Sequence, residues 1–349
     1  MDNERLTCRD YRDYGGEIEI NALDLIAHGS QGPPPEGIDY VSCLVNKSTS
    51  QSAQVKAWEQ THNNLEWVLK PDASAGIEIC SPVLKSWEGL SKLCRVADVL
   101  HDDKDVQADF RCSLHIHTDI TDLYNSEKSE ELAKLIAYWI KCELVLMDSV
   151  PFRRKNNKYC QLISATNLLN VDSKIAANVF IQALGKHKYT SFNTYHLRLE
   201  KRYTVEFRIM ENDACLDSFM TKNWTRFVLH FINMAVKAQL PPPYKPGNIN
   251  SGLCLYDLAD VIKFLRFDGS CELSPGLKQV RNWFLGRLYY NISDVSVDNS
   301  FWKVGREISK RQLTTILGDL EKREGIKVNK EWVAPSNVQQ AVYGEEYIE

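Results

Sequence analysis

The sequence contains no CxxC pair, although it has ten cysteines spread from Cys8 to Cys271. A zinc site built from cysteine pairs therefore has no support. The sequence also lacks an uninterrupted apolar run that could span a bilayer, because charged residues interrupt its two most apolar stretches, 132–147 and 224–240. The first twenty residues hold nine charged side chains and no apolar core of a secretion signal. We expect reduced thiols, a cytoplasmic location and no membrane partner.

The chain also lacks a strong excess of charge of either sign. Its 42 Lys and Arg residues face 46 Asp and Glu residues, which gives a formal net charge of -4 at pH 7. This balance does not indicate nucleic acid as a partner, although a modified nucleobase stays open as a small substrate. Internal repeats and low-complexity segments are absent as well. With 349 residues, 44% of them hydrophobic, the chain can bury the core of one large domain or two modest ones.

The spacing of apolar residues predicts several long helices. Apolar side chains recur every three or four positions, which is the period of a helix with one buried face. The predicted helices are 86–101, 129–148, 217–239, 255–266, 276–290 and 306–324.

A run of three prolines, Pro241-Pro242-Pro243, ends the third of these helices. It marks the clearest boundary in the chain. We expect a catalytic body of mixed α and β structure at 1–240 and a mainly helical extension at 241–349. The connection 21–75 is expected to be a long loop, apart from a hairpin near its end, and loops of this size commonly set specificity.

Four short segments alternate between apolar residues and residues that bind metals or phosphates. Successive side chains of a strand point to opposite faces, so each segment would have one apolar and one polar face. The segments are G-E-I-E-I at 16–20, G-I-E-I at 76–79, L-H-I-H at 114–117 and T-V-E-F-R-I at 204–209. Their polar positions are Glu17, Glu19, Glu78, His115, His117, Glu206 and Arg208.

If these strands share a sheet, their common polar face gathers four carboxylates. Neighbouring carboxylates raise one another's pKa, so such a face needs cations. Mg²⁺ or Mn²⁺ takes carboxylate oxygens and accepts an occasional imidazole, and the fork of Arg208 suits a phosphoryl oxygen. Any one segment alone is typical of an ordinary sheet with a solvated outer face. A solvated face normally mixes Thr, Lys, Gln and Ser, however, so the four segments together favour a binding site.

The same segments resemble the amidoligase family of the glutamine synthetase and glutamate–cysteine ligase superfamily, which contains carboxylate–amine ligases. The most specific pieces are E-I-C-S-P-V-L at 78–84 and E-F-R at 206–208, and the resemblance spans about residues 14–240. It implies an α+β fold, with a curved antiparallel β-sheet of the glutamine synthetase type that helices pack against. The concave face of that sheet would hold ATP and two or three Mg²⁺ or Mn²⁺ ions.

The resemblance also implies a reaction and a role for each matched residue. A substrate carboxylate would attack the γ-phosphate of ATP, and an amine would then displace phosphate from the acyl phosphate to form an amide. Arg208 falls where an arginine contacts the phosphates, and we expect it to be catalytic together with Glu206. The residues that fall at metal-ligand positions are Glu17, Glu19, Glu78, His115 and Glu206.

Three further positions have two interpretations each. Asn193 either contacts the substrate or nucleotide or is an ordinary turn asparagine. Arg153 lies where the family tends to have a basic residue and would then be a catalytic residue; otherwise it is a solvated surface arginine. His117 either contacts the substrate or supports the metal ligands from behind. The sequence departs from the family at Ser113, where glycine is usual.

Two other functions compete with the ligase interpretation. The string H-I-H-T-D at 115–119 is similar to a metal-binding motif of barrel hydrolases, which points to a metal-dependent hydrolase or phosphoesterase. A non-catalytic binding protein with a ligase fold is the other alternative, although four retained carboxylates would then destabilise the protein without a cation. A carboxylate donor and an amine acceptor are the expected partners, and nothing in the sequence identifies either one or the oligomeric state.

Overall fold

The computed structural model describes residues 12–22, 37–56, 65–72, 74–124, 129–155, 157–163, 188–198, 203–239, 255–293 and 300–325. These residues form two compact units. The sheet unit comprises the described parts of 10–117 and 210–225, and the helical unit those of 118–209 and 226–332. The chain passes between the units inside strand β6 (Leu114–Asp119) and inside helix α8 (Ser218–Lys237).

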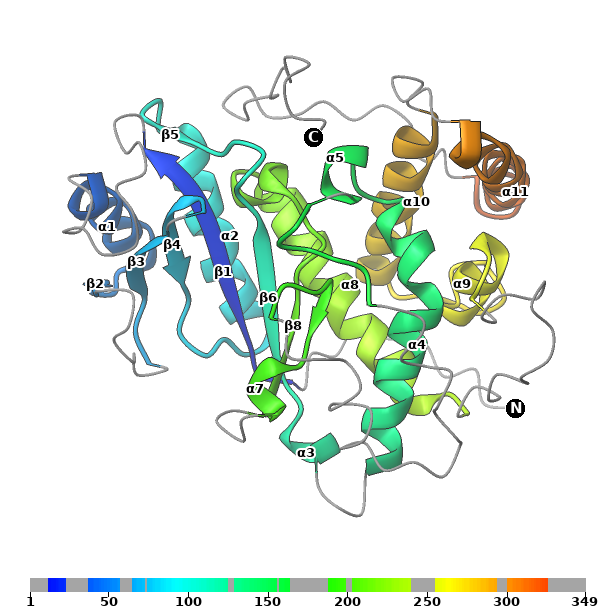
Figure 1. Ribbon diagram of the computed structural model, residues 1–349, viewed down its shortest axis with the longest axis horizontal. Helices are drawn as coiled ribbons and strands as arrows, with labels where there is room; N and C mark the ends of the chain where they lie inside the picture. Colours follow the sequence, from blue (N-terminus) through cyan, green and yellow to red (C-terminus); the bar gives the residue numbers. More distant parts are fainter. Residues whose placement is uncertain are drawn as a thin grey trace. The chain divides into compact units, whose positions relative to one another are not determined.

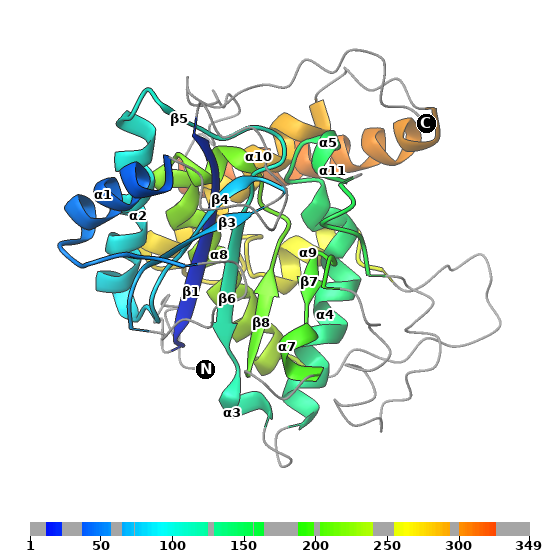
Figure 2. The ribbon, with the colours of Figure 1, turned by 60° about the vertical axis from the view of Figure 1, so that its left-hand side comes forward.

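The sheet unit is built on a mostly antiparallel sheet. Its strands lie in the order β2, β3, β4, β1, β6 (Figure 1), and β5 pairs with β1 outside this path. Figure 2 shows β1 and β6 side by side. Only the β2–β3 pair is parallel among the strand pairs whose register the structure describes in this unit. Apart from β6, the bounds of these strands are β1 (Tyr14–Ala22), β2 (Gln54–Val55), β3 (Val68–Asp72), β4 (Gly76–Cys80) and β5 (Val106–Gln107).

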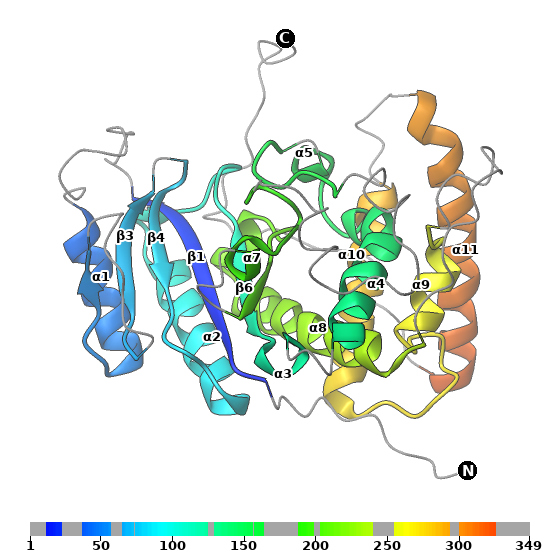
Figure 3. The same ribbon diagram turned by 60° about the horizontal axis from the view of Figure 1, so that its bottom comes forward.

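One face of this sheet packs against helix α2 (Ser86–Asp102), which lies behind β1 and β4 in Figure 3. Ile18 and Ile20 of β1 are fully buried, and so are Leu90 and Leu93 of the helix. A Cβ atom at Gly16 would lie 2.8 Å from Cδ1 of Leu93, so a larger residue there would have to displace the Leu93 side chain. The isoleucine face is therefore the core face, as the alternation predicts.

Helix α1 (Gly37–Thr49) corrects the expectation of a long loop between residues 21 and 75. Its buried residues include Ile38, Val41 and Val45, which give it an apolar stripe at helical spacing. β-branched residues, Ser and Thr have low helix propensity, so the local sequence barely signals this helix. Packing against α2 and β3 stabilises it instead (Figure 1).

The helical unit contains a short antiparallel strand pair and most of the long helices. Strand β7 (Phe192–Asn193) pairs with β8 (Thr204–Phe207). The long helices are α4 (Ser129–Met147), the second half of α8, α10 (Pro275–Ser293) and α11 (Ser300–Glu324). The short ones are α3 (Thr121–Tyr124), α5 (Phe152–Lys155), α7 (Tyr195–Arg198) and α9 (Leu258–Phe264).

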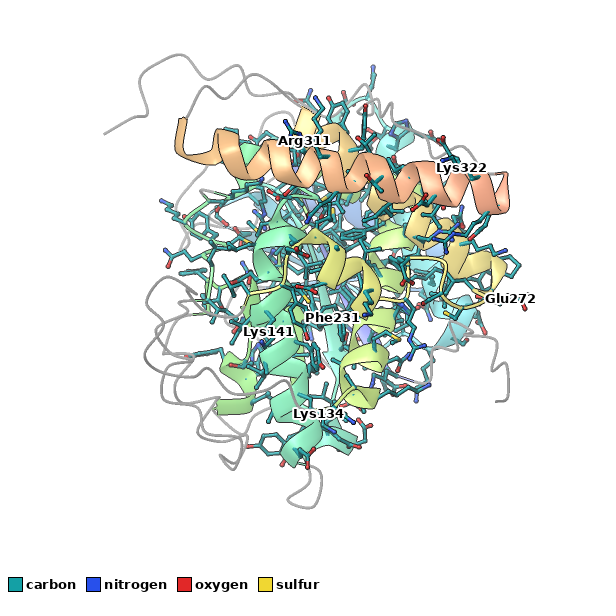
Figure 4. The ribbon with its side chains drawn as sticks, turned by 90° about the vertical axis from the view of Figure 1, so that its right-hand side faces the viewer. Lys134, Lys141, Phe231, Glu272, Arg311 and Lys322 are labelled. Atoms are coloured by element: carbon teal, nitrogen blue, oxygen red, sulfur yellow. The ribbon has the colours of Figure 1, made fainter. Side chains whose placement is uncertain are left out.

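Aromatic side chains form the core of the helical unit. Trp139 of α4 is fully buried, and its ring lies 5.1 Å from that of Phe207 and 5.3 Å from that of Phe231. Phe264 of α9 reaches the same cluster, with its ring 5.5 Å from Phe231. Figure 4 shows α9 beside α4 and α8, near the labelled Lys141 and Phe231. This core fixes α4 against the β7–β8 pair.

The six helices expected from apolar spacing are all present, with ends that differ by a few residues. The coarse fold class, α+β with a mostly antiparallel sheet, is confirmed, and the curvature of the sheet stays a prediction. Residues 241–254 lie outside the described part of the chain, so the domain boundary near residue 240 also stays a prediction. Among the described residues, no helix combines the length and the apolar character that a membrane span requires.

Candidate active site

Two neighbouring strands of the sheet unit carry the first three carboxylates. The register places Glu19 of β1 opposite Glu78 of β4, and Glu17 opposite Cys80. Glu19 is 5% exposed and Glu78 is 8% exposed, so both carboxyl groups are largely withdrawn from water. The glutamates expected on these two strands therefore share one polar face within the sheet unit.

The two histidines of β6 lie against the carboxylate of Glu17. Nδ1 of His115 is 3.3 Å from one of its oxygens, and Nε2 of His117 is 3.1 Å from the other. Nε2 of His115 lies 2.7 Å from the hydroxyl of Ser113, and that hydroxyl also donates to Glu19. Ser113, the departure from the family pattern, thus joins a buried histidine to a buried carboxylate.

The pKa values of two carboxyl groups on this face are shifted in opposite directions. Burial alone would raise the pKa of Glu17, but the charge of His117 and hydrogen bonds from both imidazoles bring that pKa well below its usual value. Burial and the charge of Glu17 raise the pKa of Glu78, against the opposing effect of Lys70. Two neighbouring carboxyl groups with opposite pKa shifts are typical of a functional site rather than a solvated face.

Three residues of this face were not predicted from the sequence. Lys70 and Asp72 of β3 and Cys80 of β4 follow the same alternation as the glutamates. The ammonium of Lys70 is 2.6 Å from the carboxylate of Glu78, and the thiol of Cys80 is 3.0 Å from the same oxygen. The signal was present in K-P-D at 70–72, but the proline made this segment resemble a turn rather than a strand.

The carboxylates fit a hard divalent cation. One oxygen each of Glu19, Asp72 and Glu78 lie within 4.8 Å of one another. Oδ1 of Asp72 accepts hydrogen bonds from the backbone of Ser74 at 2.6 Å and of Ala75 at 3.0 Å, which orients its carboxylate. Three oriented oxygens from three adjacent strands are the donor set that Mg²⁺ or Mn²⁺ prefers.

The helical unit brings together three other expected residues. Asn193 of β7 lies opposite Glu206 of β8, and its amide donates to the Glu206 carboxylate at 2.6 Å. Arg208 forms an ion pair with the other oxygen of Glu206, and its Nε donates to the carbonyl of Tyr159 at 3.3 Å. Oδ1 of Asn193 accepts from the backbone of Tyr195 at 2.8 Å, so Asn193 makes a turn contact and orients Glu206 as well.

Arg154, rather than Arg153, is the basic residue whose contacts the structure describes here. Arg154 is 3% exposed and donates to the backbone carbonyl of Arg208 and, at 3.3 Å, to that of Ile209. Arg153 belongs to α5, but its side chain lies outside the described residues, so its expected role stays a prediction. Whether the sets in the two units share one face also stays a prediction.

Glu143 of α4 is a buried carboxyl group that the sequence reasoning treated only as an interruption of an apolar stripe. It is 3% exposed and accepts from the backbone of Ile163 at 3.0 Å and from the hydroxyl of Ser191. The indole of Trp139 donates to the same hydroxyl at 3.0 Å. The carbonyl of Ser191 in turn accepts from the backbone of Arg208 at 2.9 Å. Glu143 therefore braces the backbone of Arg208, just after β8, through Ser191.

Glu143→Gln is expected to flatten the pH dependence of stability. Burial raises the pKa of Glu143 from 4.5 to about 7, so the folded protein keeps this proton longer than the unfolded chain. Its stabilising contribution is complete below about pH 4.5 and is lost as the pH rises towards 7, by roughly 3 kcal/mol. Glutamine cannot ionise, so the unfolding free energy of the variant should not decline between pH 4.5 and 7 on this account. Denaturant titrations at pH 5, 6 and 7 measure the unfolding free energy.

The matched control for this prediction is Glu130→Gln. Glu130 lies on the same helix, but its side chain is 66% exposed and pairs with Lys134. This variant should keep the wild-type slope of unfolding free energy against pH. An unchanged slope in Glu143→Gln would mean that Glu143 is ionised in the folded protein.

A surface cavity of about 500 Å³ lies at the start of α2 and involves none of the expected site residues. Charged and apolar groups line it together, including Asp13, Leu65, Lys85 and Lys92. The ion pair between Lys85 and Asp13, at 2.9 Å, crosses this surface. Its mixed lining does not indicate a particular ligand.

Comparison with known protein families assigns most of these segments, although not β1, to one family. A family model described as "Putative amidoligase enzyme" matches residues 42–232, which is more than half of the chain. The chain belongs to the amidoligase family. This match extends from α1 to the middle of α8 and includes Glu78, both histidines of β6 and the Glu206–Arg208 pair.

Solved structures that resemble this amidoligase are distant. A bifunctional glutathione synthetase from Pasteurella multocida is 10% identical with a TM-score of 0.39; the match covers 88% of this chain and 52% of that one. The amidoligase thus spans about half the length of that synthetase. A glutamate–cysteine ligase from Francisella tularensis in complex with AMP is 8% identical with a TM-score of 0.40, and the match covers 92% and 86% of the two chains. No curated protein matches the amidoligase.

Proposed function

We propose that this amidoligase is an ATP- and divalent-cation-dependent carboxylate–amine ligase that forms an amide through an acyl phosphate. The observation that carries the proposal is the convergence of Glu19, Asp72 and Glu78 on one buried spot in a member of this family. Buried carboxylates at this spacing destabilise a protein unless cations neutralise them. A cation site of this kind suits the handling of polyphosphate substrates.

Each group of residues has a defined task in this reaction. Glu17, Glu19, Asp72 and Glu78 would hold the cations, and His115 and His117 orient Glu17 through the contacts at 3.3 and 3.1 Å. Cations held there would supply neutralisation of charge on the transferred phosphoryl group. Arg208, aligned by its ion pair with Glu206, donates to phosphate oxygens. Glu206 serves as a further ligand, and Asn193 fixes its orientation at 2.6 Å.

The reaction proceeds by two displacements. An oxygen of the substrate carboxylate attacks the γ-phosphorus of ATP, the bond from that phosphorus to the bridging oxygen breaks, and ADP leaves. The amine nitrogen then attacks the acyl carbon, phosphate leaves with the former carboxylate oxygen, and the nitrogen loses a proton. The chain contributes mainly by positioning and electrostatic stabilisation.

The barrel-hydrolase alternative has no comparable support. Barrel hydrolases carry their metal-binding histidines on a closed sheet of parallel strands. Here His115 lies on the strand beside β1, in a mostly antiparallel sheet, and contacts Glu17 and Ser113. A non-catalytic binding protein would bind Mg·ATP without turnover, so the same assay distinguishes it.

The test is ADP release from Mg·ATP in the presence of a panel of carboxylates and amines, followed by mass spectrometry of condensed products. Amino acids, peptides, cell-wall fragments, polyamines and modified nucleobases belong in the panel. We expect ADP release that requires one carboxylate and one amine, and a product whose mass equals their sum minus water. Metal-dependent hydrolysis that proceeds without ATP would contradict the proposal.

A further inference from the structure

A partly buried lysine lies among the carboxylates of the sheet unit. The register places Lys70 of β3 opposite Glu78 of β4, which in turn lies opposite Glu19 of β1. The ammonium of Lys70 is 2.6 Å from Oε1 of Glu78, and the side chain of Lys70 is 18% exposed. One positive charge therefore lies at the end of a row of buried carboxylates.

The ammonium of Lys70 lies directly against the largely buried carboxylate of Glu78, so the two opposite charges stabilise each other where water screens them little. Lys85 offers a contrast within the same unit. Its ammonium is 2.9 Å from Asp13, but its side chain is 71% exposed, so water screens that pair.

The contacts of Glu78 set up a competition. Both Lys70 and the thiol of Cys80 contact Oε1 of this carboxylate, at 2.6 and 3.0 Å. A divalent cation that binds Glu19, Asp72 and Glu78 brings two positive charges to the same carboxyl group. The ammonium and the cation would repel each other, because both would approach the same largely buried carboxylate.

We propose that Lys70 is a built-in counter-cation of the site. It neutralises Glu78 while no divalent cation is bound, and it withdraws when one binds, so it sets the concentration at which the site fills. This inference rests on the proposed function in one respect, the binding of a divalent cation by these carboxylates. The role proposed for Lys70 differs from that of the carboxylates, because Lys70 opposes the binding of the cation and the carboxylates bind it.

Lys70→Met should therefore change two properties in opposite directions. The variant keeps an apolar side chain of similar length but leaves Glu78 without its ammonium partner. In EDTA its melting temperature should fall by roughly 5–10 °C, because an unpaired buried carboxylate remains. Its affinity for Mn²⁺ should rise by about tenfold, because a like charge has been removed from the site.

The experiment measures thermal unfolding in EDTA and Mn²⁺ binding by calorimetry without nucleotide. Lys70→Arg keeps the charge and should retain affinity close to that of the wild type. Lys85→Met is the matched control and should change neither property. Lys70→Gln, which retains a hydrogen-bond donor for Glu78, is measured in parallel in case the methionine variant does not fold, and it should also bind Mn²⁺ more tightly.

Unchanged or weaker Mn²⁺ affinity in both neutral variants would overturn the inference, and so would an unchanged melting temperature in EDTA. The proposed function is judged separately, by ADP release from the wild-type protein. If the wild type releases ADP and the neutral variants bind Mn²⁺ no better, the role of Lys70 falls and the proposed function stands. If no variant binds Mn²⁺, the inference falls as well.

Discussion

Arg208→Ala is expected to lower the rate of ADP release by about a thousandfold, which is the effect of losing a main electrostatic contact to the transferred phosphoryl group. The guanidinium is held by its ion pair with Glu206 and by the carbonyl of Tyr159 at 3.3 Å. Its backbone is fixed by Ser191 on one side and by Arg154 on the other. An arginine so constrained loses little conformational freedom when phosphate binds, so its contribution to the rate is large.

The comparison variants separate charge, geometry and folding. Arg208→Lys keeps the charge without the planar fork and should recover only part of the activity. Glu206→Gln should lower ADP release to a similar extent, because it removes the ion-pair partner of Arg208. Arg111→Ala is the matched control, because Arg111 also pairs with a carboxylate, Asp109, but its side chain is 41% exposed. Circular dichroism and melting temperature check that each variant is folded. Full activity in folded Arg208→Ala would remove the central claim of the proposed function.

The polar face of the sheet unit is the part of the site that the sequence predicts best. Alternation requires only that a strand exists, and Ile18 and Ile79, both fully buried, confirm which face is the core. Alternation does not reveal register, however. That Glu19 faces Glu78 while Glu17 faces Cys80 follows from how β1 and β4 pair, which depends on contacts distant in sequence.

The third strand shows why part of this face escaped prediction. Asp72 accepts two backbone hydrogen bonds from the turn that follows β3, so it resembles a turn residue in the local sequence. Proline at position 71 strengthens that impression, although β2 pairs only with Val68 and Leu69, so Pro71 lies beyond that pairing and needs no partner on that side. Only the pairing of β3 with β4 brings Lys70 and Asp72 onto the polar face.

The long helices of the helical unit were predicted, but its short elements and its buried polar contacts were not. The apolar stripe of α4 is visible in the sequence, and Glu143 is one of the residues that interrupt it. Which interruptions are solvated depends on what packs outside the helix: Glu130 is exposed, whereas Glu143 meets Ser191 and Ile163 from segments far along the chain. The same limit explains why neighbouring Arg153 and Arg154 could not be distinguished by residue type alone.

Glu19→Gln and Asp72→Asn should each weaken Mn²⁺ binding by roughly a hundredfold, because each removes one anionic oxygen from a set of three. Both substitutions preserve shape. In Asp72→Asn the amide oxygen can still accept from the backbone of Ser74 and Ala75. In Glu19→Gln the amide oxygen can still accept from the hydroxyl of Ser113. Calorimetric titration of Mn²⁺ without nucleotide measures the loss.

The stability of the same variants in EDTA should remain the same or increase, because one of several buried like charges has been removed. This opposite sign distinguishes a cation site from a set of structural ion pairs, in which neutralising a carboxylate would destabilise the fold. Glu88→Gln is the control: its side chain is 80% exposed, it pairs only weakly with Lys92 at 3.3 Å, and its loss should change neither property. If Glu19→Gln and Asp72→Asn destabilised the protein in EDTA and still bound Mn²⁺ as the wild type does, these carboxylates would be structural, and the cations of the proposed reaction would require other ligands.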